Sequence, residues 1–353
     1  MEPSAGSPAS ILVRTPNWVG DAVLAVPAIE ALRAAYPGAR MVVLAVPWVA
    51  DVFRFVPAVD ELLRFDRKGR HRGLVGTERL ARELRARRFD LAITLPRSTS
   101  SAWLLWRTRA RERVGYAGSV PRGWLTRAVR FPGKGRPGHH ELELHLELVR
   151  GLGVDAPVRA PRLTVPGELA ARRDELLRAS GVAGRRYLAV SPGAAFGGAK
   201  RWTTSGFAAV CDRAYRERGL EAVLLGSPGE RPIAREVAAA ARRPPVDLAG
   251  RVGLADALSL IAGATALVTN DSGLMHAGAA FGVPVVAVFG PTDWIATGPV
   301  SERASVVREP VACAPCFLRD CPIDHRCMTR VDAARVWTAA SGLLGAPVGT
   351  AAA

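Results

Sequence analysis

The segment 270–273, with the sequence Asn-Asp-Ser-Gly, has residue types that suit binding of a phosphate group. It follows the short apolar run Ala266–Thr269, and a helical pattern of small residues begins within it, over Ser272–Phe281. Backbone N–H groups at the start of a helix bind anions, and Gly273 would let the backbone approach a phosphate closely. Asp271 and Ser272 are also good N-cap residues, so a capped helix without a ligand is the alternative interpretation.

A second group of candidate residues lies in the glycine-rich loop that follows residues 187–191. The loop contains Pro-Gly-Ala-Ala at 192–195 and Gly-Gly at 197–198, and it leads into Lys200. A lysine that leaves such a loop toward a helix N-terminus suits a diphosphate, although loop lysines are usually only solvated. The sequence has no GxxxxGK[ST] phosphate loop, and no GxGxxG follows the first apolar run. These absences argue against an ATPase or a dinucleotide-dependent enzyme.

Strands and helices must position these residues, and the apolar pattern predicts both along the whole chain. In the first half we expect strands at 11–13, 41–46, 61–65, 91–95 and 114–116 and helices over 22–36, 77–88 and around 103–107. In the second half we expect strands at 187–191, 221–226, 246–247, 266–269 and 283–289 and helices over 168–180, 204–218, 231–242, 254–262 and 272–281. This alternation predicts an α/β fold with a parallel, doubly wound sheet in each half.

The length and a break in the pattern predict two domains. A chain of 353 residues with 49% apolar residues exceeds one ordinary core, and Pro157–Pro166 interrupts the alternation. We expect an N-terminal domain over 1–166, a C-terminal domain over 167–340 and a disordered tail over 341–353. Ligands of doubly wound sheets bind beyond the carboxyl ends of the strands. We therefore expect the loops after the strands to line a cleft between the domains.

The charge of the chain predicts a polyanionic partner. The net charge is +16, and 20 basic but only 7 acidic residues lie between Asp60 and Arg136. Nucleic acid, anionic lipid and a phosphorylated glycan would all respond to this field. The window shows no aromatic stacking pattern and no recognition helix, so we expect no nucleic acid partner. A general excess of solvated arginines is the alternative.

The sequence contains no segment typical of membrane insertion or export. No apolar run approaches the about 20 residues that span a bilayer, and Met1–Ser10 lacks the pattern of a secretory signal. We expect a cytoplasmic protein without a transmembrane segment, whose thiols stay reduced.

Four of the five cysteines lie close together, at Cys313, Cys316, Cys321 and Cys327. Their number suits a structural zinc or iron–sulfur site, but the later spacings are not those of a zinc ribbon. Reduced thiols that hold a loop are the alternative, and we expect no metal in the functional site.

Longer stretches of the sequence resemble the bacterial ADP-heptose:lipopolysaccharide heptosyltransferases, glycosyltransferase family 9. The similar segments include VRTPNWVGDAV, SPGAAFGGAKRW, LLGSPGE, LVTNDSGLMHAG and CAPCFLRDCPIDHRCM. They occur in the family's order over nearly the whole chain, and the first and last are most similar to the type II enzymes. The resemblance implies a GT-B architecture, with two Rossmann-like domains that face each other across a cleft. The N-terminal domain would bind the acceptor and the C-terminal domain the nucleotide sugar.

The resemblance also implies a reaction. Family members transfer L-glycero-D-manno-heptose from ADP-heptose, here to the inner-core heptose of a Kdo–lipid A acceptor, with inversion at the anomeric carbon. No cofactor is implied, because helix N-termini and basic side chains can stabilise the leaving diphosphate. The acceptor implies peripheral contact with the cytoplasmic face of the inner membrane. The alternatives are a type I or another ADP-heptose-dependent transferase and, from another class, a non-catalytic polyanion-binding protein.

The resemblance assigns roles to individual residues. Asp21 matches the catalytic aspartate, the general base for the acceptor hydroxyl, although an N-cap for a helix from Ala22 is the alternative. Lys200 matches the lysine that contacts the diphosphate, and Asp271 would accept hydrogen bonds from sugar hydroxyls. The other expected donor-binding residues are Ser191, Gly193, Glu230, Val252, Ser272, Gly273, Leu274 and His276.

The expected acceptor-binding residues lie in the first half of the chain. They are Asn17, Gly20, Arg67, Lys68 and Arg97, of which the last three follow predicted strands. The chain departs from the family before Lys200, where hydroxyl-bearing residues are replaced by Ala194, Ala195 and Phe196. Phosphate contacts are therefore expected from the backbone or from Ser191, Thr203 and Thr204.

Overall fold

The computed structural model describes residues 7–118, 120–133 and 138–345. Contacts within the chain divide it into two compact units, Met1–Thr164 and Val165–Ala353. We refer to them as the N-terminal and the C-terminal unit. Each unit is built around one six-stranded sheet.

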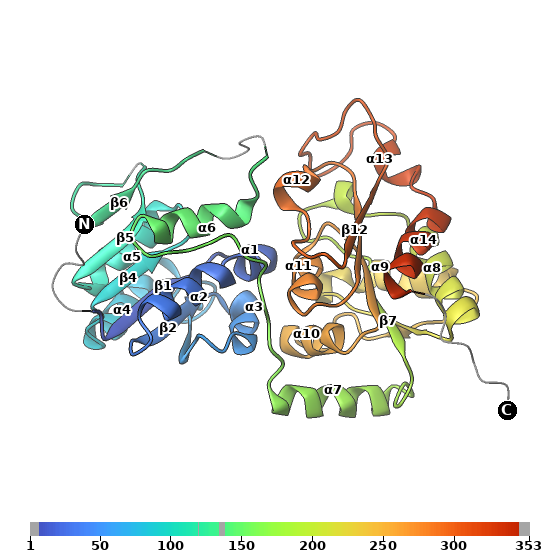
Figure 1. The fold of residues 1–353 in the computed structure, drawn as a ribbon, viewed down its shortest axis with the longest axis horizontal. Helices are drawn as coiled ribbons and strands as arrows, with labels where there is room; N and C mark the ends of the chain where they lie inside the picture. The colour runs from blue at the N-terminus through green and yellow to red at the C-terminus, as the bar shows by residue number, and fades with distance from the viewer. Residues whose placement is uncertain (1–6, 119, 134–137, 346–353) are drawn as a thin grey trace. The chain divides into compact units, whose positions relative to one another are not determined.

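The N-terminal unit alternates strands with helices (Figure 1). Its strands are β1 (Ser10–Arg14), β2 (Arg40–Ala45), β3 (Glu61–Arg64), β4 (Leu91–Thr94), β5 (Glu112–Tyr116) and β6 (Arg127–Val129). Its helices are α1 (Val19–Leu24), α2 (Val26–Ala35), α3 (Pro47–Ala50), the 3₁₀ helix η1 (Asp51–Phe55), α4 (Gly73–Ala86), α5 (Thr99–Thr108) and α6 (Glu141–Arg150).

The C-terminal unit repeats this pattern. Its strands are β7 (Tyr187–Ser191), β8 (Glu221–Leu224), β9 (Val246–Asp247), β10 (Ala266–Asn270), β11 (Val285–Phe289) and β12 (Ala304–Arg308). Its helices are α7 (Gly167–Ala179), α8 (Thr204–Arg218), α9 (Arg231–Ala240), α10 (Leu254–Ala262), α11 (Gly273–Ala280), α12 (Trp294–Thr297), α13 (Arg326–Thr329) and α14 (Ala333–Leu344), with the 3₁₀ helices η2 (Gly198–Lys200) and η3 (Pro228–Glu230).

Both sheets are parallel and have the same strand order. The order is β3-β2-β1-β4-β5-β6 in the N-terminal unit and β12-β11-β10-β7-β8-β9 in the C-terminal unit. In each sheet the direction of winding reverses between the first and fourth strands, which are β1 and β4 in one unit and β7 and β10 in the other. Ligands of doubly wound sheets bind beside the carboxyl ends of such strands. The predicted α/β class with two doubly wound units is confirmed.

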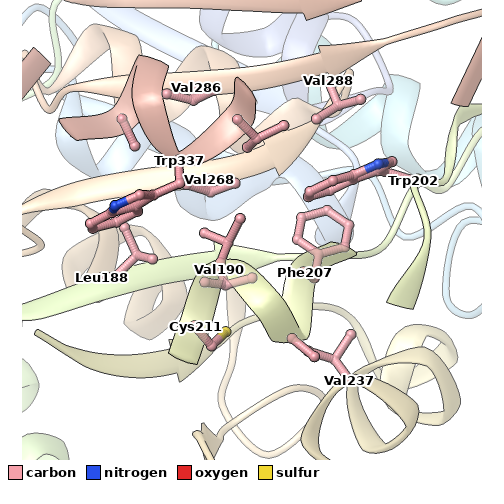
Figure 2. Packing of buried hydrophobic residues seen from close by; sticks show 14 of the residues in the cluster. Leu188, Val190, Trp202, Phe207, Cys211, Val237, Val268, Val286, Val288 and Trp337 are labelled. Atoms are coloured by element: carbon pink, nitrogen blue, oxygen red, sulfur yellow. The ribbon is translucent and has the colours of Figure 1, made fainter. Parts of the chain in front are cut away.

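The strand sequences explain why the C-terminal sheet is covered on both faces. β10 reads ALVTN and β11 reads VVAVF, and every residue of both strands is buried, as in parallel strands that pack against helices on each side. Val190 and Val268 belong to the core shared with α8 and α14. Figure 2 shows this core, with Trp202 next to Phe207. The intervening Ala189 packs in the core shared with α10 and α11.

Several elements differ from the sequence-based expectation. The helix expected over 22–36 is two helices, α1 and α2, and Pro27 lies in the first turn of the second, where proline is tolerated. The short edge strands β6 and β12 were not predicted. Helix α14 extends through Leu344. The prediction of a disordered tail from residue 341 is therefore wrong for residues 341–344, which are helical. Residues 346–353 of that tail lie outside the described residues.

Within the described ranges, the helices are all too short or too polar to cross a bilayer.

Candidate functional site

Asn270, the last residue of β10, joins the two ends of the glycine-rich loop. Its side chain is fully buried. Nδ2 donates to the carbonyl oxygens of Pro192 (2.8 Å) and Gly193 (3.2 Å), and Oδ1 accepts from the backbone N–H of Trp202 (2.9 Å). Because β7 and β10 are paired strands, this one amide fixes the loop over the carboxyl edge of the sheet where the winding reverses.

Trp202 anchors the far end of the same loop in the core. Its indole is 1% exposed, and its ring centre lies 4.9 Å from that of Phe207 in an edge-on arrangement (Figure 2). The indole N–H donates to the carbonyl oxygen of Val331 (3.0 Å). A large aromatic ring that is held by packing and a hydrogen bond has little freedom to move. The anchored Trp202 therefore also fixes the position of the backbone at Lys200, two residues earlier.

Lys200 and Asp271 form an ion pair at this edge. The Lys200 Nζ lies 2.5 Å from Oδ2 of Asp271, and their side chains are 14% and 6% exposed. The hydroxyl of Thr292 donates to the same carboxylate oxygen (2.6 Å), and the lysine also lies 4.9 Å from the ring centre of Phe196. An ammonium group has three N–H donors, so one bond to Asp271 is compatible with further bonds to a ligand's oxygens.

Helix α11 begins beside this ion pair. Ser272 is its N-cap residue, but the Ser272 side chain makes no capping hydrogen bond. Its hydroxyl instead lies 3.1 Å from that of Thr269. The first N–H groups of the helix, from Gly273 onward, therefore keep their capacity to bind an anion. The same helix places Leu274 half-buried against the core and His276 in a buried position.

Glu230 lies against the backbone of Gly193. Its carboxylate accepts hydrogen bonds from the backbone N–H (2.7 Å) and hydroxyl (2.8 Å) of Ser227. A Cβ atom placed on Gly193 would be 2.1 Å from Oε1 of Glu230, so a larger residue at this position would require the Glu230 side chain to move. The structure therefore brings Gly193 and Glu230 together with the Asn270 network. Ser191 is buried at the end of β7, and Val252 packs half-buried against the core before α10.

The cysteine-containing segment packs against the Lys200 turn. The backbone N–H of Ala199 donates to the carbonyl oxygen of Arg319 (2.9 Å), and Nε2 of His325 lies 2.7 Å from the carbonyl oxygen of Ala199. The backbone N–H of His325 donates in turn to Sγ of Cys321 (3.3 Å). These contacts make residues 319–325 a support for the turn that carries Lys200.

The four clustered cysteines are free thiols. Burial, with the neighbouring Cys313, Cys321 and Cys316, raises the pKa of Cys327 to about 11. In the part of the chain that the structure describes, no three His, Cys, Asp or Glu side chains are arranged to hold a metal ion. What the structure shows for this segment is its packing against the Lys200 turn.

The expected catalytic residue, Asp21, lies in the N-terminal unit. It is exposed in the first turn of α1, three positions after the N-cap residue Trp18. The alternative role of Asp21 as the N-cap of a helix starting at Ala22 is therefore wrong. Gly20 lies half-buried beside it in the same turn.

Three of the expected acceptor-binding residues contact two aromatic side chains, Trp48 and Phe65. The carbonyl oxygen of Asn17 accepts from the indole N–H of Trp48 (2.8 Å), and Lys68 Nζ lies 5.3 Å from the Trp48 ring centre. Arg67 follows β3 with its guanidinium carbon 5.7 Å from the ring centre of Phe65. Trp48 therefore connects Asn17 with Lys68.

Arg97, after β4, stacks on a different ring. Its guanidinium carbon lies 3.4 Å from the ring centre of Phe131, so the described contacts do not join it to Arg67 or Lys68.

Two residues of these sites, Thr292 and Arg14, were not singled out from the sequence, and Asn270 was named only as the first residue of the Asn-Asp-Ser-Gly segment, without a role of its own. Asn270 and Thr292 organise the Lys200–Asp271 pair, and Arg14 hydrogen-bonds the side chain of Asn17. Asn270 and Arg14 are each the last residue of a strand beside the reversal of winding. Their position at a strand end could have indicated a role in a site, but a polar residue at a strand end is more often part of an ordinary turn.

Comparisons with known proteins agree with this geometry. The model of glycosyltransferase family 9 (heptosyltransferase) matches residues 77–326. The lipooligosaccharide heptosyltransferase 2 of Haemophilus influenzae is 32% identical over 309 residues, which are 85% of this chain and 88% of the relative. The expected resemblance to this family and to its type II members is confirmed.

Two solved structures are similar over nearly the whole chain. The ADP-heptose lipopolysaccharide heptosyltransferase II of Escherichia coli has a TM-score of 0.80 and 28% identity, and covers 95% of this chain and 98% of its own. A family 9 glycosyltransferase of Veillonella parvula has a TM-score of 0.85 and 26% identity, with coverage of 95% and 97%. These similarities confirm the expected GT-B architecture.

Proposed function

The chain belongs to glycosyltransferase family 9, the heptosyltransferases, and from this membership we propose that it transfers heptose from ADP-heptose to the inner-core heptose of a Kdo–lipid A acceptor. The sugar is L-glycero-D-manno-heptose, and the reaction inverts the anomeric carbon. Membership of an enzyme family favours this function over a non-catalytic polyanion-binding protein. A type I or another ADP-heptose-dependent transferase is the nearer alternative.

The Lys200–Asp271 pair beside the uncapped start of α11 carries this proposal. A nucleoside diphosphate needs positive charge and N–H donors at fixed positions, and an ammonium group beside a helix N-terminus provides both. Asp271 would exchange part of its bond with Lys200 for hydrogen bonds from sugar hydroxyls. Gly193 and Glu230 would lie along the nucleoside, with Ser191 and Val252 as further contacts of the donor.

Asp21 is the proposed general base. Its carboxylate takes the proton of the acceptor hydroxyl, whose oxygen forms a bond to the anomeric carbon of the heptose. The bond from that carbon to the diphosphate oxygen breaks, and ADP leaves with the electron pair. Lys200 and the N–H groups of α11 stabilise the charge that develops on the diphosphate. This chemistry uses side chains and backbone of the chain itself.

The N-terminal unit is proposed to bind the acceptor at the cytoplasmic face of the inner membrane. The acceptor carries carboxylates and phosphates, and the exposed Arg67, Lys68 and Arg97 provide positive charge in the same unit as Asn17 and Gly20. Basic surfaces also favour peripheral contact with anionic lipids.

A nucleotide-sugar panel tests the donor proposal. The melting temperature would be measured with ADP-heptose, ADP-glucose, UDP-glucose and GDP-mannose at equal concentrations. We expect the largest rise with ADP-heptose. A ligand that binds only the folded state stabilises that state, and at equal concentration the ligand with the lowest Kd stabilises it most. An equal or larger rise with a UDP- or GDP-sugar would contradict ADP-heptose as the donor.

A further inference from the structure

Arg14 is a buried cation that has no counter-ion among the residues that the structure describes. It is the last residue of β1 and 1% exposed, and its guanidinium donates to the carbonyl oxygen of Thr15 and to Oδ1 of Asn17 (2.5 Å). Its Nε is buried without a hydrogen-bond partner. Among residues 7–118, 120–133 and 138–345, no carboxylate forms an ion pair with it. A buried charge is costly unless it is paired, so this arrangement needs an explanation.

A second guanidinium makes the charge of Arg14 still less favourable. The guanidinium carbons of Arg14 and Arg67 lie 5.5 and 5.7 Å from the ring centre of the same residue, Phe65. Burial first, and then the charge of Arg67, lower the pKa of Arg14 to about 9. Lys68 approaches from the side of Trp48, which hydrogen-bonds Asn17. Two guanidinium groups therefore share the Phe65 ring, Lys68 lies over the neighbouring Trp48, and Asn17 contributes only an amide.

The position of Arg14 is one at which ligands bind in this type of sheet. Arg14 pairs with Thr94 of β4, so it lies where the winding of the N-terminal sheet reverses. Asn17, which accepts a hydrogen bond from the guanidinium, is half-buried and belongs to the loop that leads to Asp21. An anion held by Arg14 would therefore lie at the carboxyl edge of the sheet, next to the segment that carries the proposed base.

We propose that Arg14 is the buried centre of an anion-binding site in the N-terminal unit, with Arg67 and Lys68 at its rim, and that the site takes an oxyanion group of the acceptor. A carboxylate and a phosphate share the required chemistry, because a planar guanidinium binds either with paired N–H donors. The identity of the acceptor rests on the proposed function, whereas the binding of an anion by Arg14 does not.

Binding of inorganic phosphate tests the proposal without turnover. Phosphate would replace chloride at constant ionic strength, with ADP at saturation to occupy the donor site, and the melting temperature would be recorded. We expect phosphate to raise the melting temperature of the unaltered protein. Arg14→Met should raise the apparent Kd for phosphate by about tenfold or more, as for the loss of a charge-assisted hydrogen bond. Arg79→Gln, which removes an exposed charge from α4, should leave the Kd unchanged.

A phosphate response that Arg14→Met leaves intact would overturn the proposal. If Arg14→Met does not fold, Arg67→Gln is used to test the proposal instead, because Arg67 is exposed and its substitution should leave folding intact. It should weaken phosphate binding, and an unchanged Kd would overturn the proposal. A Lys200→Ala variant should retain the response, which separates this site from the donor site even if the chain proves not to use ADP-heptose.

An acetate series distinguishes the two sources of the anion. A rise of the melting temperature with acetate as well as phosphate, lost in Arg14→Met, identifies a site for carboxylates in general. A rise with phosphate alone, also lost in that variant, identifies a phosphate site.

Discussion

Asp21 has the accessibility that a general base needs, because it is exposed in the first turn of α1. Asp21→Asn keeps the size of the side chain but removes its capacity to take a proton. We expect kcat to fall by about 10²–10⁴, the usual contribution of a positioned base, while the Kd for ADP-heptose stays within about twofold. Steady-state rates and calorimetric titration would measure the two quantities. A variant with near-full turnover would exclude Asp21 as the base.

Lys200 is predicted to act on the charged part of the donor. Lys200→Ala should weaken binding of ADP by about 10–100-fold, the value of a charge-assisted hydrogen bond, and weaken binding of adenosine much less. Titrations of both ligands would show the difference. Equal losses for both would indicate a folding defect at the Lys200 turn instead of a lost phosphate contact.

At the scale of elements, the segment 319–325 is predicted to hold the Lys200 turn in place. A Cβ atom on Gly197 would lie 2.3 Å from the backbone carbonyl oxygen of Arg319, so Gly197→Ala must push this segment away. We expect a loss of stability of about 1–3 kcal/mol, typical of overpacking, and weaker ADP binding. Denaturant unfolding and ADP titration would measure both effects.

Gly198→Ala is the matched control. A Cβ atom there would lie 3.2 Å from Oδ1 of Asp320, the end of a side chain that can rotate away. Stability and ADP affinity should both stay near those of the unaltered protein. If the two alanine variants behave alike, the 319–325 segment does not position Lys200.

The sequence predicted elements best where apolar periodicity was strong. The bounds of β7, α8 and α10 match the expected ranges. By contrast, β6 has three residues and lies at a sheet edge, where pairing with one neighbour decides its conformation. Local pattern cannot reveal such pairing.

The two sites were predictable only in part. The Asn-Asp-Ser-Gly segment and Lys200 stood out because their residue types suit phosphate, and their proximity followed from the parallel sheet. The bonds of Asn270 to residues 192 and 193 join positions nearly 80 apart, and no local pattern encodes them. Arg14 ends an apolar strand and was predicted only as the start of a loop, because its burial depends on Phe65 and Asn17 folding around it.

At the scale of the whole molecule, the basic window from Asp60 to Arg136 is predicted to attract the anionic acceptor. Raising the salt concentration from low to physiological should raise the KM for acceptor much more than the KM for ADP-heptose, because exposed charges are screened beyond about 8–10 Å. Charge reversal at Arg67 and Lys68 should have the same effect on the acceptor KM.

Charge reversal at Arg79 and Arg85, which are exposed on α4, provides the control with the same change in net charge. We expect a smaller change in acceptor KM there. Equal effects of the two double variants would show that Arg67 and Lys68 have no special part in acceptor binding. An acceptor KM that ignores both salt and charge reversal would show that the basic excess is only compositional.

Product analysis with defined acceptors tests heptose transfer most directly. The protein would be incubated with ADP-heptose and either Kdo–lipid A or the same acceptor bearing one inner-core heptose, and products would be examined by mass spectrometry. We predict the addition of one heptose to the heptose-bearing acceptor, release of one ADP per transfer, and no comparable product from Kdo–lipid A alone. Transfer to Kdo–lipid A alone would identify a type I activity, and no transfer to either acceptor would contradict the proposed function.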